Sequence, residues 1–164
     1  MPHLSAEYLP VVDDTEEEWA GWSRFYPTEQ EMAMLYSDPK INILKAKVNE
    51  FCEIYEGQNL KDVLVWTGNE YRSLKYKEFT APTGERIAPR NIEQKMYFDL
   101  LQNDNIPIKL CIGRFGTGKS MIAETWATHQ LSLGKYNKIV FVKNNLEVKG
   151  AGRLGILPGD EIEK

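Results

Sequence analysis

A glycine-rich run constrains this chain more than any other feature. Residues 113–120 read Gly-Arg-Phe-Gly-Thr-Gly-Lys-Ser and fit the phosphate-binding pattern G-x-x-x-x-G-K-[ST]. Glycines in such a loop let backbone N–H groups approach phosphate oxygens without a Cβ atom in the way. In this pattern the lysine reaches the β- and γ-phosphates, and the serine hydroxyl ligates Mg²⁺. The run therefore predicts a site for a nucleoside triphosphate and Mg²⁺.

The segments on either side of this loop support the same interpretation. Residues 108–112 are mostly apolar and predict a short strand before the loop. Residues 121–133 predict a helix after it, closed by Gly134. Residues 138–142 are β-branched and aromatic, and they predict a second strand. This order of strand, loop, helix and strand predicts an α/β fold with a parallel sheet.

The candidate site residues follow from the pattern. Lys119 and Ser120 are the expected catalytic residues, and Ser120 is also the expected ligand of Mg²⁺. The helix after the loop should add unpaired N–H groups and the positive end of its dipole. The residues expected to bind nucleotide through this loop are Gly113, Arg114, Phe115, Gly116, Thr117, Gly118, Lys119, Ser120 and Met121.

Composition limits the partners and the location of the protein. The 164 residues carry a net charge of −4, so nucleic-acid binding would need a local basic patch. No apolar run approaches the roughly 20 residues of a membrane span, and the first residues do not resemble a secretory signal. Cys52 and Cys111 are expected to be buried free thiols within strands, which indicates the cytoplasm.

Changes in residue pattern divide the chain into four expected parts. Residues 1–40 are expected to form an acidic tail, over about the first 24 positions, and a short helix that a capping box at 28–31 begins. Residues 41–80 alternate between apolar and polar positions and predict a small antiparallel β module. Residues 81–90 predict a linker, and residues 91–164 contain the phosphate-binding loop.

The β module and the segment after it have further expected features. The module is either a platform for a nucleic acid or partner, or a packing appendage on the rest of the chain, which we favour. Residues 91–101 predict an amphipathic helix with Asn91 as its N-cap. Ile92, Met96 and Leu100 would lie on its apolar face.

Three blocks together resemble the PhoH family of P-loop ATPases. Residues 87–95, Ile-Ala-Pro-Arg-Asn-Ile-Glu-Gln-Lys, resemble the Pro-Arg-Asn-x-x-Gln motif at the start of the family's ATPase domain. The second block is the loop, and the third lies within 143–164 and includes Gly-Ile-Leu-Pro-Gly-Asp. The resemblance covers about residues 41–164 and implies part of a RecA-like P-loop fold that acts on ATP with Mg²⁺. By analogy with helicase Q motifs, it also implies that Gln94 lies near the adenine.

The sequence departs from the family pattern in two places. Residues 143–145 read Lys-Asn-Asn where many family members have Thr-Arg-Pro, so the contact of that arginine is not expected. No later strand ending in Asp-Glu follows, although such a strand would hold Mg²⁺ through water. We therefore expect an ATPase domain that is truncated before its acidic Mg²⁺-binding strand. The alternatives are a fragment whose other half lies elsewhere and a short protein that oligomerisation completes.

Three functions fit these observations. The first is ATP binding, with hydrolysis in the complete protein; the resemblance alone implies coupling to RNA and a homo-oligomeric ring. The second is a nucleotide-responsive binding module without hydrolysis of its own, because the acidic strand is missing. The third is a phosphoryl transferase such as a small-molecule kinase, against which the Leu-Pro-Gly-Asp block argues.

Overall fold

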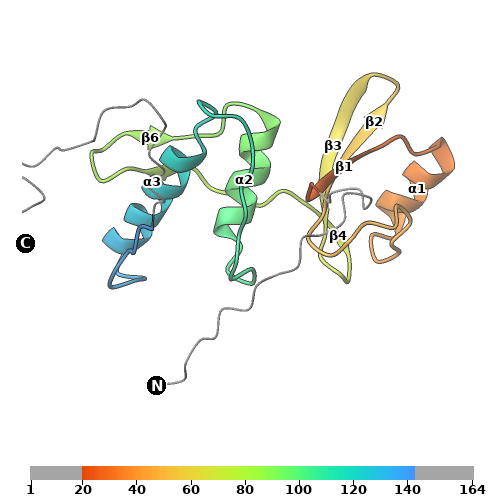
Figure 1. Ribbon diagram of the computed structural model, residues 1–164. Helices are drawn as coiled ribbons and strands as arrows, with labels where there is room; N and C mark the ends of the chain where they lie inside the picture. The colour runs from red at the N-terminus through yellow and green to blue at the C-terminus, as the bar shows by residue number, and fades with distance from the viewer. Residues whose placement is uncertain (1–19, 143–164) are drawn as a thin grey trace, which may run out of the picture.

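The computed structural model describes residues 20–142 as a mixed α/β arrangement of short strands and three helices (Figure 1). The elements in chain order are β1 (Trp22–Phe25), α1 (Glu29–Ser37), β2 (Phe51–Glu56), β3 (Asn59–Trp66), β4 (Tyr71–Ser73), β5 (Phe79–Thr80), β6 (Arg86–Ile87), α2 (Ile92–Gln102) and α3 (Lys119–Ser132). The acidic block at 13–18 and the third block of the family resemblance, within 143–164, lie outside the described residues.

The first half of the described chain is a four-stranded sheet in the order β1-β2-β3-β4. The pairs β2–β3 and β3–β4 are antiparallel, as the alternation in residues 41–80 predicts. The edge strand β1 is parallel to β2, and it includes residues 22–24, which were expected to belong to the acidic tail. Phe25 packs against the core under the sheet, whereas Trp22 and Arg24 face outward. A four-residue alternation is too short to stand out from the surrounding polar sequence.

One face of this sheet packs against α1. Leu35 of α1, Ile54 of β2 and Trp66 of β3 are buried in one cluster, together with Cys52. Burial raises the pKa of the Cys52 thiol to about 12, so this cysteine is a neutral apolar side chain at pH 7. The expectation of a buried free thiol is confirmed at this position.

The capping box before α1 forms as the sequence predicts. The Thr28 hydroxyl accepts a hydrogen bond from the Glu31 N–H at 3.3 Å, and Glu31 Oε2 accepts one from the Thr28 N–H at 2.8 Å. These two bonds satisfy donors that the first turn of a helix otherwise leaves open. The bond from the Thr28 N–H is the main cause of the lowered pKa of Glu31.

Replacing Thr28 with alanine should lower the free energy of unfolding by about 1 kcal/mol at neutral pH. Because the folded-state pKa of Glu31 is lowered, its contribution to stability is present above the unfolded pKa of about 4.3 and is lost as pH falls through the folded pKa. Thr28→Ala keeps the N–H that is the main cause of this shift and loses only the bond from Thr28 Oγ1 to Glu31 Oε2, at 2.9 Å. The gap in stability between wild type and Thr28→Ala should therefore shrink in acid only by the contribution of that bond. Urea unfolding at pH 7 and at pH 3 measures it, with Thr28→Ser as the control that keeps the cap.

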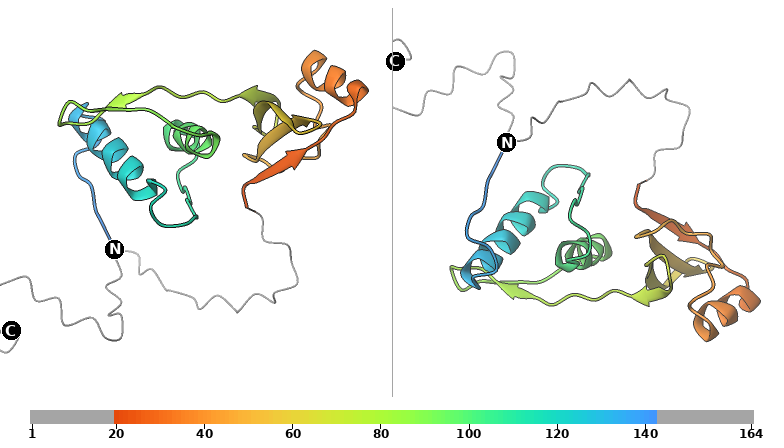
Figure 2. Two further views of the ribbon diagram at one scale, coloured as in Figure 1. Left: turned by 90° about the horizontal axis from the view of Figure 1, so that it is seen from above. Right: turned by 90° about the horizontal axis from the view of Figure 1, so that it is seen from below.

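Helix α2 lies between the sheet and α3 (Figure 2). On one side Met96 packs against Phe51, Val63 and Val65 of the sheet. On the other side Phe98 packs in a cluster formed by Phe79, Ile87 and Ile122. Helix α2 thus contributes side chains to two apolar clusters, one with the sheet and one with α3.

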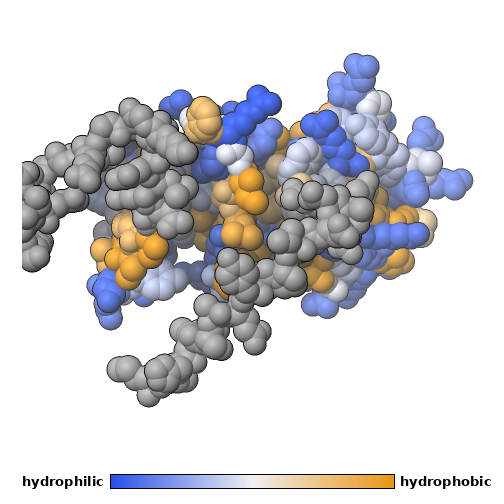
Figure 3. Space-filling view, in the orientation of Figure 1, coloured by the Kyte–Doolittle hydropathy of each residue, from blue (hydrophilic) through white to orange (hydrophobic). Residues whose placement is uncertain are grey.

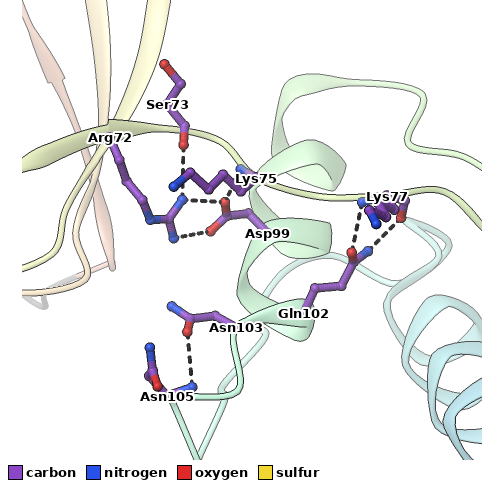
Figure 4. A network of polar contacts seen from close by, with 8 residues as sticks. All are labelled: Arg72, Ser73, Lys75, Lys77, Asp99, Gln102, Asn103 and Asn105. Atoms are coloured by element: carbon purple, nitrogen blue, oxygen red, sulfur yellow. Dashed lines mark hydrogen bonds and ion pairs between the residues drawn. The ribbon is translucent and has the colours of Figure 1, made fainter.

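Polar contacts fasten the sheet and the chain after it to α2 (Figure 4). Asp99, which is 2% exposed, accepts bonds from Arg72 Nη1 and Nη2 at 2.7 and 2.8 Å and from the Lys75 N–H at 2.6 Å. One turn further along α2, the Gln102 amide pairs with both the N–H and the C=O of Lys77 at 2.8 and 2.7 Å. The β module is therefore held to α2 by charge-assisted hydrogen bonds as well as by apolar packing.

The two strands expected on either side of the phosphate-binding loop are absent from the described structure. Residues 108–112 and 138–142 are not in strands, so those predictions were wrong for the described chain. Ile112 is 93% exposed and Val142 is 90% exposed. Parallel strands are stable when neighbours pair with them and helices cover both faces, and within residues 20–142 the only sheets are those formed by β1 to β6. Cys111 is correspondingly exposed, contrary to expectation.

None of the described helices combines the length and the apolar character needed to cross a membrane. The part of the chain that the structure describes also holds no group of three or more metal-ligating side chains.

Candidate functional site

The glycine-rich loop runs directly into α3. Gly116 and Gly118 have φ values of +80° and +86°, a region that side-chain-bearing residues rarely adopt. Gly118 is also the N-cap of α3 and provides no side-chain acceptor for the N–H groups of the first turn. These donors and the helix dipole therefore face the loop, where an anion would satisfy them.

Lys119 lies folded back over the loop. Its Nζ donates to the carbonyl oxygen of Arg114 and, at 3.2 Å, to the hydroxyl of Thr117. A Cβ placed on Gly113 would lie 3.7 Å from Lys119 Cδ, so the lysine stem crosses close to the start of the loop. Phosphate oxygens are stronger acceptors for an ammonium group than a carbonyl or a hydroxyl, because they carry charge.

The other predicted residues of the loop lie at the surface. Ser120 is in the first turn of α3 and is exposed, as a ligand of an incoming cation must be. Phe115 is fully exposed and Met121 is 53% exposed.

Gln94 reaches the loop from α2. Its Oε1 accepts from the Arg90 N–H at 2.8 Å, and its Nε2 donates to the Thr117 carbonyl at 3.3 Å. The structure therefore brings together two motifs that lie more than 20 residues apart in the sequence. A groove of about 630 Å³ opens beside this contact, and its lining includes Ile87, Pro89, Arg90, Gln94, Gly118 and Met121.

Tyr97 is a site residue that sequence reasoning missed. Its hydroxyl donates to the Lys119 carbonyl at 3.5 Å, and burial raises its pKa to about 12, so it stays a neutral donor at pH 7. It lies three positions after Gln94, which places both on neighbouring turns of α2. The three-residue spacing between Gln94 and Tyr97 is the sequence feature from which the position of Tyr97 beside the loop could have been predicted.

Cys111 lies beside Tyr97, immediately before the loop. Desolvation raises the pKa of its thiol, although the nearby Lys119 ammonium and the Tyr97 hydroxyl oppose that shift. The thiol is therefore neutral at pH 7, and it does not compete with a phosphate for the lysine.

The aromatic residues of α3 have a packing role. Trp126 and His129 both stack near Phe79 of β5, at centroid distances of 5.1 and 5.7 Å. The Nδ1 atom of His129 lies 3.0 Å from the Thr80 carbonyl, so in this arrangement Nδ1 carries a proton and donates. These contacts fix α3, and therefore the loop at its start, against the β5–β6 pair.

Comparison with known proteins shows a family match in the second half of the chain. The sequence model of the family described as PhoH-like protein matches residues 86–164, the part of the chain that contains the loop and α3. This segment is PhoH-like, and members of that family are in general P-loop ATPases.

Relatives support the assignment. The chain is 28% identical to Protein PhoH2 of Bacillus subtilis (strain 168) over 93% of its own length and 36% of that protein. It is 33% identical to the PhoH-like protein of Mycobacterium tuberculosis (strain ATCC 25618 / H37Rv) over 62% of its length and 28% of that protein. The chain thus spans about a third of the length of these relatives. No solved structure matches it.

Proposed function

We propose that this chain binds ATP with Mg²⁺ through residues 113–120, and that ATP hydrolysis is the activity of the complete protein. The observation that carries the proposal is the position of Lys119. Its ammonium lies over a loop of left-handed glycines, at the start of a helix whose N-cap offers no side-chain acceptor. This arrangement concentrates cationic and N–H donors where the triphosphate would lie.

In this proposal each site residue has a defined role. Lys119 and the backbone of residues 114–119 stabilise the β- and γ-phosphates, and Ser120 ligates Mg²⁺. Gln94 and Met121 line the groove in which the base would lie. Residues 91–164 would then form the first part of a RecA-like domain. Within the proposed tail and helix at 1–40, β1 adds a strand to the β module at 41–80, and the proposed linker at 81–90 contains β6.

We also propose a cytoplasmic location on the basis of the composition. Coupling to RNA and assembly into a homo-oligomeric ring are proposed on the basis of the family resemblance.

Lys119→Ala tests the proposal. Isothermal titration of the 164-residue chain with Mg·ATP should show binding by the wild type and a loss of at least about a hundredfold in affinity for the variant. The variant loses charge-assisted hydrogen bonds to two phosphates, each worth about 1.5–3 kcal/mol. Lys95→Ala, on the exposed face of α2, is the matched control and should bind as the wild type does. Equal affinities for wild type and Lys119→Ala would contradict the proposal.

A second function is favoured by the position of α2. This helix contacts the loop through Gln94 and the β module through Met96 and Asp99. A nucleotide that orders the loop could therefore change how the module meets a partner, without any hydrolysis. Phosphate release by this chain that Lys119→Ala abolishes would rule out this second function.

A further inference from the structure

The amide of Gln94 is occupied by the protein backbone at both ends. We propose that Gln94 is a positioning residue that fixes the 88–91 segment to the phosphate-binding loop, and that the site accepts purine triphosphates without reading the edge of the base. The proposal rests on the nucleotide-binding function proposed above. It predicts that ATP and GTP bind almost equally well.

The oxygen of Gln94 has a structural partner. The Asn91 side chain caps α2 by accepting from the Gln94 N–H at 2.8 Å, and Gln94 Oε1 accepts from the Arg90 N–H at the same distance. This reciprocal pair resembles a capping box whose returning bond is displaced by one residue. The bond fixes how the chain enters α2, and it needs no ligand to account for it.

The nitrogen of Gln94 holds the loop. Nε2 donates to the Thr117 carbonyl, and it lies 3.6 Å from where a Cβ on Gly118 would be. The Thr117–Gly118 peptide group comes immediately before Lys119, so its orientation sets the backbone that faces the phosphates. Loss of this bond should weaken phosphate binding whatever base is attached.

Reading adenine would require the same atoms. In the usual bidentate contact, a glutamine oxygen accepts from N6 of adenine while its nitrogen donates to N7. Turning the amide toward a base would break its bonds to the Arg90 N–H and the Thr117 carbonyl, two groups at exposed residues that would then bond to water. The backbone bonds therefore compete directly with base recognition.

Part of the groove offers apolar surface for a base. Ile87, Pro89, Met121 and Ile122 line it together with the charged residues Glu85, Arg86 and Arg90, and the oxygen of Asn91 is already engaged as the helix cap. Apolar side chains contact the face of any purine. A site that makes no hydrogen bond to the distinguishing group separates two ligands only weakly.

The wild-type chain provides the first test. Isothermal titration with the Mg²⁺ complexes of ATP, GTP and N6,N6-dimethyl-ATP should give affinities within about threefold of one another. The dimethyl analogue cannot donate from N6, so it reports base reading without any mutation. A loss of more than about tenfold for this analogue or for GTP would overturn the proposal.

Gln94→Ala provides the second test. It should weaken ATP, GTP and inorganic tripolyphosphate by the same factor, about tenfold for two lost hydrogen bonds. Gln94→Glu keeps an acceptor for the Arg90 N–H, but it sets a carboxylate against the Thr117 carbonyl. This variant should therefore bind ATP, GTP and tripolyphosphate no more tightly than Gln94→Ala does. Gln102→Ala removes the matching clamp on Lys77, away from the groove, and should leave all three affinities unchanged.

The outcomes separate this inference from the proposed function. A loss confined to ATP in Gln94→Ala, with tripolyphosphate unaffected, would show that Gln94 reads adenine and would overturn the inference alone. Failure of the folded wild type to bind any of the ligands would refute the nucleotide function, and the inference with it. Thermal unfolding of each variant shows whether a lost affinity reflects a changed site or an unfolded protein. The titrations of the wild type with ATP, GTP and N6,N6-dimethyl-ATP test the inference without any variant.

Discussion

Asp99→Ala should lower the free energy of unfolding by about 3–5 kcal/mol, one of the two largest effects that we expect in this chain. The Asp99 side chain is 2% exposed and the Arg72 side chain 16%, so the variant leaves a largely buried guanidinium without its partner. It also removes the acceptor of the Lys75 N–H. The hydrogen bonds from Arg72 to Asp99 are the main cause of the raised pKa of Arg72, and the variant removes them. A guanidinium keeps its charge at neutral pH even without them, so charge neutralisation of the arginine does not relieve the loss. Urea unfolding followed by circular dichroism measures the effect.

Two controls distinguish the buried pair from ion pairs in general. Asp104 pairs with Lys135 at the same 2.7 Å, but their side chains are 68% and 40% exposed, so Asp104→Ala should change stability little. The double variant Arg72→Met/Asp99→Leu replaces both charges with apolar groups and should recover much of the stability that Asp99→Ala loses. A stability of Asp99→Ala equal to that of Asp104→Ala would show that the buried pair does not hold the module to α2.

The features that sequence predicted well depend on neighbouring residues. The capping oxygen of Thr28 and that of Asn91 each meet an N–H three residues later, so the pattern can be read directly from the chain. The extent of α3 and the left-handed glycines of the loop are equally local. The antiparallel pairing of β2 and β3 needs only a short turn between two apolar runs.

Features that depend on distant partners were not predicted. Arg72 and Asp99 are 27 residues apart, and nothing in either local sequence shows that they meet. The strand β1 pairs with β2 across a similar separation and has only four residues. Residues 108–112 have the composition of a strand, but composition does not supply the neighbouring strands that a parallel sheet requires.

In the candidate site, too, the features set by neighbouring residues were predicted and those set by distant partners were not. The loop could be predicted because one short pattern contains its glycines, lysine and serine. Family resemblance implied that Gln94 lies near the adenine, but its amide bonds to Arg90 and to Thr117 of the loop come only from the structure. The approach of Tyr97 to the Lys119 carbonyl is likewise a consequence of how α2 packs beside α3.

Packing on α2 decides where the loop lies. Consecutive residues of this helix face different parts of the protein, because Asp99 pairs with Arg72 of β4 and Phe98 packs toward α3. Ile122 of α3 lies in the same cluster as Phe98, one turn after the loop. The position of the loop relative to Gln94 therefore depends on this cluster.

Phe98→Ala should accordingly destabilise the protein by about 3–5 kcal/mol, the cost of truncating a fully buried aromatic side chain. Phe98 is 0% exposed, stacks on Phe79 at a centroid distance of 5.1 Å and meets the edge of Tyr76 at 6.0 Å. Urea unfolding measures the loss, and Phe98→Leu, which keeps most of the buried volume, should lose clearly less.

The same substitution separates the packing of α2 from the chemistry of the loop. Phe98→Ala removes no group that lines the groove, so any loss of Mg·ATP affinity in its folded fraction must come from displacement of α3 relative to Gln94. Because a cavity at Phe98 lets Ile122 shift, we expect weaker binding of Mg·ATP even at a temperature where the variant remains folded. Titration at low temperature, after circular dichroism has verified the fold, tests this. Wild-type affinity in a folded but destabilised variant would show that the loop keeps its geometry without support from the cluster around Phe98.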